Sequence, residues 1–137
     1  MNINAEVEKM VIQRIDPKNQ GPQKGFIPAI RDGNIAYISG QVGKDSSGRI
    51  VGPDISSQTR QTFDNIKEIL QLCEGSLENI TKLTVFLTDA EDMDNFRKIR
   101  AEYFNAPALP TSTLVVVSAL AQNELRVEVE AVAHLSN

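Results

Sequence analysis

Few residues of this 137-residue sequence belong to the types that most often catalyse reactions. Cys73 is the one cysteine, so the chain forms no internal disulfide and no zinc site made of four cysteines or of two cysteines and two histidines. His134 is the one histidine and lies three residues from the end, so a Ser-His-Asp triad or a His-rich metal site would depend on that single ring. We expect a site without metal or cofactor, built from carboxylates, hydroxyls and backbone groups.

Glu128 is the carboxylate best placed for chemistry. It lies in a C-terminal stretch in which every second residue is apolar, and the predicted buried face is formed by Val127, Val129, Ala131, Ala133 and Leu135. Glu128 belongs to the opposite, mixed face, where a carboxylate can activate or orient water if burial raises its pKa toward neutrality. The structural alternative is an ion pair with Arg31 or Arg126 of a neighbouring chain.

The other candidates by residue type have simpler structural roles. Cys73 falls on the apolar side of a predicted helix, where a free cysteine behaves as a small hydrophobic residue. The acidic cluster Asp89, Glu91, Asp92 and Asp94 lacks the ligand spacing of a calcium loop and fits the electrostatics of a helix start. Neither feature predicts a redox or metal site.

Six strands and two helices are expected to position these groups. Strands are predicted at residues 11–15, 26–31, 35–42, 80–87, 113–117 and 125–135, where β-branched and other apolar residues gather between turn signals. Helical spacing predicts helices from 55 to about 73, with Gly75 as a left-handed cap, and from about 93 to 104. The order β-β-β-α-β-α-β-β predicts an α+β fold, a single domain over residues 1–137 with both helices on one face of a mixed sheet. Residues 1–10 are expected to form a loosely ordered N-terminal segment.

The second face of that sheet has no predicted helix to cover it. Two helices cover only one face of a sheet of five or six strands, yet the segment 113–117 (TLVVV) is apolar on both faces. We therefore expect another copy of the chain to bury the second face, which predicts a homo-oligomer with a cleft at the subunit interface.

Four blocks of the sequence follow a known family pattern: residues 37–42 (YISGQV), 58–66 (QTRQTFDNI), 83–89 (LTVFLTD) and 127–133 (VEVEAVA). In this order and spacing they resemble the Rid family, the reactive intermediate deaminases, also called the YjgF family or endoribonuclease L-PSP. The resemblance implies a chorismate-mutase-like α+β fold and a homotrimer with three clefts between subunits. It also implies hydrolysis of reactive enamines and imines, such as 2-aminoacrylate, to a keto acid and ammonia.

The chain departs from active members of that family at three positions. Active members hold the substrate carboxylate with an arginine just before the penultimate strand, and Ser112 stands at that position here. A hydroxyl offers one neutral hydrogen bond instead of a charged, bidentate fork, a loss on the order of 2–5 kcal/mol of binding. Phe26 replaces a family tyrosine, and Leu114 replaces a small or thiol residue. Another arginine, such as Arg31, is a candidate replacement.

The features that this chain shares with the family complete the predicted site. Ser39 and Gly40 are expected to line the cleft floor, and Glu128 takes the position that orients the hydrolytic water in active members. The predicted catalytic residue is thus Glu128. The predicted substrate-binding residues are Phe26, Ser39, Gly40, Phe86, Ser112, Thr113 and Leu114.

Two functions remain open from these residues. The first is a hydrolytic deaminase of a small imine or enamine, with a substrate preference altered by Ser112; the second is a non-catalytic small-molecule-binding or chaperone-like trimer that has lost deaminase activity. A ribonuclease is disfavoured by the net charge of −4, the lack of a basic patch with interleaved aromatics and the single histidine. The polar N-terminus and the absence of a long apolar run predict a cytoplasmic protein with no nucleic-acid or membrane partner.

Overall fold

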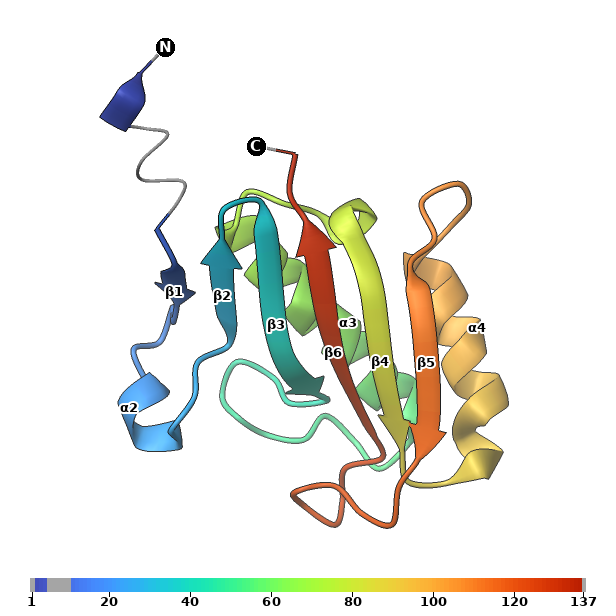
Figure 1. The fold of residues 1–137 in the computed structure, drawn as a ribbon. Helices are drawn as coiled ribbons and strands as arrows, with labels where there is room; N and C mark the ends of the chain where they lie inside the picture. Colours follow the sequence, from blue (N-terminus) through green and yellow to red (C-terminus); the bar gives the residue numbers. More distant parts are fainter. Residues whose placement is uncertain (1, 5–10, 137) are drawn as a thin grey trace.

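The computed structural model describes residues 2–4 and 11–136, which form one six-stranded sheet with its long helices on one side (Figure 1). The strands are β1 (Gln13–Ile15), β2 (Ala29–Asp32), β3 (Ile35–Val42), β4 (Ile80–Leu87), β5 (Thr111–Val116) and β6 (Val127–His134). Their order across the sheet is β1-β2-β3-β6-β4-β5, in which β4 and β5 are parallel and all other neighbours antiparallel. The predicted α+β fold with a mixed sheet is confirmed.

The two predicted helices are α3 (Ile55–Leu72) and α4 (Met93–Tyr103). The described residues also form three short helical turns: α2 (Gly21–Lys24) before strand β2, and η1 (Leu77–Asn79) and η2 (Ala90–Asp92) between α3 and α4. Four residues that include a glycine and a proline carry no apolar periodicity, so α2 could not be predicted. No helix in the described part of the chain is long and apolar enough to cross a membrane. The expectation of a loosely ordered segment at residues 1–10 falls mostly on residues outside those described.

Helix α3 has a defined cap at each end. The Asp54 carboxylate accepts a hydrogen bond from the Ser57 N–H at 2.9 Å at the start. The left-handed residue after the helix is Glu74, with φ of 59°, so the prediction of Gly75 as the left-handed cap was wrong by one position. Gly75 is required by space instead, because a Cβ atom there would lie 2.7 Å from Cδ2 of Leu135.

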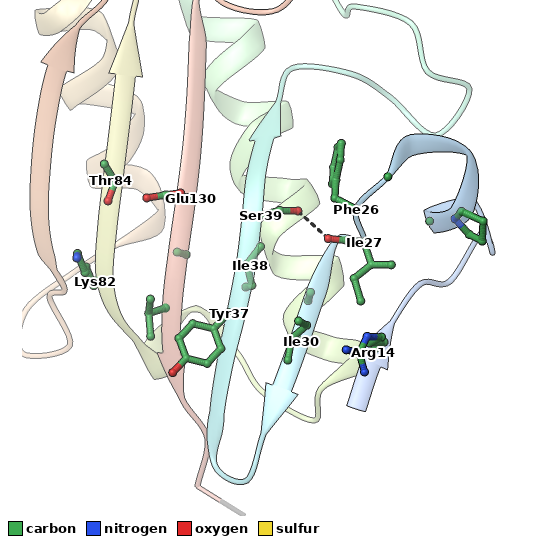
Figure 2. A pocket seen from close by; sticks show the side chains of 16 residues that line it. Arg14, Phe26, Ile27, Ile30, Tyr37, Ile38, Ser39, Lys82, Thr84 and Glu130 are labelled. Atoms are coloured by element: carbon green, nitrogen blue, oxygen red, sulfur yellow. Dashed lines mark hydrogen bonds between the residues drawn. The ribbon is translucent and has the colours of Figure 1, made fainter. Parts of the chain in front are cut away.

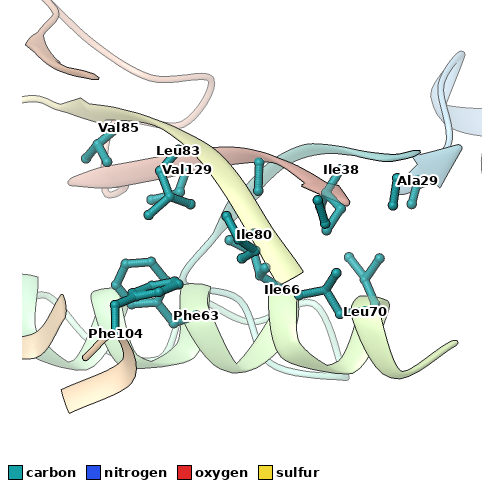
Figure 3. Packing of buried hydrophobic residues seen from close by; sticks show 14 of the residues in the cluster. Ala29, Ile38, Phe63, Ile66, Leu70, Ile80, Leu83, Val85, Phe104 and Val129 are labelled. Atoms are coloured by element: carbon teal, nitrogen blue, oxygen red, sulfur yellow. The ribbon is translucent and has the colours of Figure 1, made fainter. Parts of the chain in front are cut away.

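The hydrophobic core fills the space between the sheet and the two long helices (Figure 3). Phe63 of α3 lies at the centre of an aromatic cluster in this core. Its ring centroid is 6.0 Å from the ring centroid of Phe96, 5.2 Å from that of Tyr103 and 5.3 Å from that of Phe104. The sheet residues that pack against these helices include Ile38, Leu83, Val85 and Val129. The thiol of Cys73 is buried in the same core, as its position on the helix predicted.

The opposite face of the sheet, here called the open face, is covered by neither α3 nor α4 (Figure 1). Apolar groups are nevertheless present on it: Tyr37 is 50% exposed and Val115 is 41% exposed. Ile30 and Val132 beside them are half-buried. This uncovered apolar surface is the feature on which the prediction of an oligomer depends, and Glu128 lies on it.

Candidate functional site

Glu128 lies beside a bulge in strand β3. In the bulge, Ser39 and Gly40 together oppose one residue of β6, Glu130. The Glu128 side chain passes over Gly40, because a Cβ atom on Gly40 would come within 2.5 Å of Glu128 Oε1. The absent side chain of Gly40 therefore provides the space that the Glu128 carboxylate occupies.

The surroundings of Glu128 favour its protonated form. Its side chain is half-buried, and this burial raises the pKa of the Glu128 carboxyl above its ordinary value, while the negative charge of Glu130 raises it further. No cation of residues 2–4 and 11–136 lies within ion-pair distance of Glu128. A carboxylate with a raised pKa can take a proton from water and return it within one reaction cycle.

Ser39 fixes the chain segment that precedes strand β2. Its hydroxyl lies 3.1 Å from the carbonyl oxygen of Ile27 and 3.0 Å from that of Pro28, so it donates its one proton to this pair of acceptors (Figure 2). Its backbone N–H also donates to the Pro28 carbonyl at 2.9 Å. Ser39 therefore positions residues 26–28 against the cleft floor, and its oxygen can still accept a hydrogen bond.

Phe26 is presented to solvent by the short helix α2. The Asp16 carboxylate accepts hydrogen bonds from the N–H groups of Gln20 at 3.1 Å and Gly21 at 2.6 Å, which holds the start of α2. Gly25 ends α2 in the left-handed conformation, with φ of 78°, and turns the chain toward β2. The Phe26 ring that follows is 58% exposed, and it forms an apolar wall with no hydroxyl to offer.

A hollow of about 690 Å³ lies on the open face between Phe26 and strand β4 (Figure 2). Its apolar lining includes Phe26, Ile27, Ile30, Tyr37 and Val132. Its polar lining includes Arg14, Ser39, Lys82, Thr84 and Glu130. Small-molecule sites have this composition, with mostly apolar walls and a few polar groups. The described residues contain no cluster of three His, Cys, Asp or Glu side chains that would suit a metal ion.

One chain brings most of the predicted site residues to this face. Phe86 of β4 pairs directly with Glu128 across the strands, and Thr113 of β5 pairs with Thr84 of β4. The predicted residues that lie on or at the open face with Glu128 are Phe26, Ser39, Gly40, Phe86 and Thr113.

Ser112 and Leu114 lie on the other side of strand β5. Ser112 pairs with Leu83, which is fully buried under the helices, and Leu114 packs against the same core. Strand β5 is an edge strand, separated from β6 by β4. Ser112 and Glu128 of one chain thus face opposite sides of the sheet and cannot contact the same small ligand.

The arginines considered from the sequence are both engaged away from the carboxylate. Arg31 lies on the helix side, where its Nε donates to the Gly33 carbonyl at 3.1 Å and its Nη1 to the Cys73 carbonyl at 3.2 Å. Arg126 forms a bidentate ion pair with Asp92, with both N···O distances 2.9 Å. Within one chain, neither arginine supplies a cation to the open face.

Arg100 of α4, which sequence reasoning did not assign to the site, is the cation beside Ser112. Its Nη1 donates to the Ser112 hydroxyl oxygen at 3.3 Å, and its guanidinium carbon lies 5.5 Å from the ring centroid of Phe96. The four-residue spacing from Phe96 indicates that the two side chains share a helix face. That this helix face lies beside Ser112 depends on tertiary packing, which cannot be predicted from the spacing of residues along the helix.

The chain thus has an α+β fold in which a half-buried glutamate lies over a strand bulge, on the uncovered face of a six-stranded sheet. The family model for endoribonuclease L-PSP matches residues 17–135 of this chain. The chain therefore belongs to this family, which is also known as the Rid or YjgF family.

Relatives of known name and structure agree with this assignment. A RutC family protein of Pyrococcus horikoshii is 37% identical over 129 residues, which cover 93% of this chain and 98% of the relative. A mouse protein named 2-iminobutanoate/2-iminopropanoate deaminase is 34% identical over 128 residues, which cover 93% of this chain and 91% of the mouse protein. A crystal structure of a Rid family protein of unknown function from Yersinia pestis is 32% identical, with a TM-score of 0.82, and covers 91% of this chain and 100% of its own.

Proposed function

We propose that this protein is a hydrolytic deaminase that converts small reactive imines and enamines to carbonyl compounds and ammonia. The observation that carries the proposal is the Glu128 carboxylate, which is half-buried, has a raised pKa and lies over Gly40. Ser39 and Glu130, the chain neighbour and the cross-strand partner of Gly40, line the hollow of about 690 Å³ on the same face. The name of the mouse relative supports the same reaction class. The open face supports a homotrimer, in which a second copy would complete each cleft.

In the proposed reaction, Glu128 accepts a proton from a water molecule as the water oxygen bonds to the imine carbon. The electron pair of the C=N π bond moves to nitrogen, and protonated Glu128 returns its proton to that nitrogen, which becomes an amino group. Ionised Glu128 then takes the hydroxyl proton of the carbinolamine and passes it to the amino nitrogen as the C=O bond forms and the C–N bond breaks. Ammonia leaves, and the cycle requires no metal or redox group.

The walls of the cleft support a substrate preference that differs from that of family members with a tyrosine and an arginine. Phe26 offers an apolar ring without a hydroxyl, and Ile27, Ile30 and Tyr37 continue that apolar surface. Imines with an apolar side chain would bury more surface there than the imine of alanine, at about 0.8 kcal/mol for each buried CH₂ group.

The proposal is tested by ammonia release from imines that an amino-acid oxidase generates in situ. We expect a rate above the spontaneous hydrolysis, and a loss of about 100-fold or more in Glu128→Gln, because the amide cannot accept the proton from water. Glu68→Gln is the matched control, since Glu68 is exposed on α3 and lies outside the site. The proposal fails if no imine is turned over, or if Glu128→Gln is as fast as Glu68→Gln.

One observation favours a second candidate, a non-catalytic binding protein. Ser112 offers a hydroxyl where active family members are expected to use an arginine, and a weaker hold on substrate accompanies loss of catalysis. Saturable binding of keto acids to the cleft with no turnover of any imine would support this function. Turnover that depends on Glu128 would exclude it.

A further inference from the structure

We infer that Arg100, together with Ser112, binds the carboxylate of a substrate whose imine carbon lies at Glu128 of a neighbouring copy. The inference rests on the proposed function and deepens it, because it names the residue of this chain that would recognise the carboxylate of 2-imino acids, the substrates in the mouse relative's name. Three properties of Arg100 carry it: its free hydrogen-bonding capacity, its rigid placement and its position at the edge of the sheet.

Arg100 is a half-buried cation without an anionic partner. No carboxylate of the described residues lies within 4.0 Å of its guanidinium, whereas Arg60 pairs with Glu102 and Arg126 pairs with Asp92. A guanidinium has five N–H donors, and the structure uses one of those of Arg100, toward Ser112. The remaining donors are available to a planar anion, and a carboxylate matches their fork geometry.

The placement of Arg100 is fixed from two sides. The guanidinium lies over the Phe96 ring, which is fully buried and therefore does not move away from it. The Ser112 oxygen accepts the Nη1–H bond, so the Ser112 hydroxyl proton is free to point outward to an anion. Serine at this position therefore has a role: it leaves room for a guanidinium from α4 and adds one donor of its own.

Glu128 and Arg100 could act on the same substrate only if they came from different chains. Ser112 is exposed on the helix side of edge strand β5, while Glu128 lies on the open face of β6, two strands away or about 10 Å across the sheet. A 2-imino acid has its carboxylate bonded directly to the imine carbon, so both groups must be held within a few ångströms. A neighbouring copy that covers the open face with its β5 edge would meet this condition.

The test compares two classes of imine in three variants. An amino-acid oxidase supplies 2-imino acids, and a flavin-dependent amine oxidase supplies imines of similar size without a carboxylate. We expect Arg100→Gln to lose about 10- to 100-fold in kcat/KM for the 2-imino acids, mainly through KM, and to change little for the other class. Arg97→Gln, which removes an exposed arginine from the same helix, should change neither. Arg100→Lys keeps the charge without the fork and should fall between Arg100→Gln and the unsubstituted protein.

The outcomes separate this inference from the proposed function. Equal losses for both imine classes in Arg100→Gln, or no loss in either, would overturn the role of Arg100 while leaving Glu128-dependent turnover intact. If no imine is turned over at all, binding of 2-oxobutanoate measured by calorimetry decides the point. If Arg100→Gln weakens this binding and Arg97→Gln does not, the carboxylate-binding role of Arg100 stands and the proposed deaminase activity falls. If binding is equal in all variants, the role of Arg100 is overturned as well.

Discussion

The Glu128 carboxylate combines two properties that usually oppose each other. In the proposed reaction it must be ionised to take a proton from water, yet burial and the charge of Glu130 both favour the protonated form. Burial and the Glu130 charge bring the pKa of Glu128 closer to neutrality, and a group with such a pKa can both accept a proton from water and return it to nitrogen. Glu130 is therefore expected to tune the pH range of the reaction without touching the water itself.

This relation predicts the behaviour of Glu130→Gln. Because the negative charge of Glu130 raises the pKa of Glu128, removing that charge lowers the pKa of Glu128. Activity requires ionised Glu128, so the acidic limb of the kcat/KM profile should move to lower pH. The profile of the exposed-site variant Glu68→Gln should stay in place. An acidic limb that stays in place in Glu130→Gln, or that moves to higher pH, would contradict Glu128 as the titrating base.

Strand β3 is the element that makes room for this carboxylate. Its bulge places Gly40 beneath Glu128, and Gly40 is not among the glycines with positive φ. Alanine can therefore adopt the backbone conformation of Gly40, and the three atoms nearest the added Cβ would all belong to the Glu128 side chain, with Oε1 at 2.5 Å. The cost falls on the flexible carboxylate rather than on the fold.

Gly40→Ala is thus expected to impair activity much more than stability. A displacement of the carboxylate by about 1 Å lowers the rate by about 100-fold, whereas the thermal midpoint should change little. The double variant Gly40→Ala with Glu128→Gln is the control, because it should be no slower than Glu128→Gln alone. Additive losses in the double variant, or a large drop in thermal midpoint in Gly40→Ala, would show that Gly40 acts through something other than Glu128.

The elements that follow a simple periodicity could be predicted from the sequence. The alternation of Val127, Val129 and Ala131 placed Glu128 on the uncovered face, and the spacing along α3 and α4 placed both helices on the other. The short helix α2 has no such period, and the left-handed cap at Glu74 is a position that residue type disfavours. These features depend on local turn geometry that the apolar pattern does not record.

The arrangement of Ser112 required more than a pattern. Its face depends on the parallel register of β4 and β5, which a crossover through α4 connects, and a shift of one residue would reverse it. Its contact with Arg100 joins residues whose side chains meet only after α4 has packed beside the sheet edge. The family pattern predicts Glu128, Ser39 and Gly40 as site residues, whereas no pattern in the sequence predicts the contact of Arg100 with Ser112.

At the scale of the whole molecule, the main feature is the difference between the two faces of the sheet. One chain covers one side of its sheet with α3 and α4 and leaves Tyr37, Val115 and the hollow uncovered on the other. The same chain places Glu128 and Arg100 on opposite sides. Assembly into a cyclic trimer would cover the apolar open face of each chain and bring Glu128 of one copy close to Arg100 of the next.

A mixed trimer tests this account most directly. Arg100→Gln and Glu128→Gln chains with different affinity tags are co-expressed, and trimers that contain both are purified on the two tags in turn. Each parent variant must first sediment at three times the 15.1 kDa of one chain, and a monomer at micromolar concentration would already contradict the account. In a cyclic trimer of either mixed composition, one cleft combines an intact Glu128 with an intact Arg100.

We therefore predict that, at substrate concentrations well below KM, mixed trimers hydrolyse 2-imino acids at about one third of the rate of the unsubstituted protein. Under the same conditions the Arg100→Gln trimer should keep about 1–10% of that rate and the Glu128→Gln trimer about 1% or less. The restored activity should disappear when both substitutions are placed in the same chain and mixed with either parent, because no cleft then holds both groups. Mixed trimers as inactive as their parents would contradict a site shared between Glu128 of one copy and Arg100 of the next.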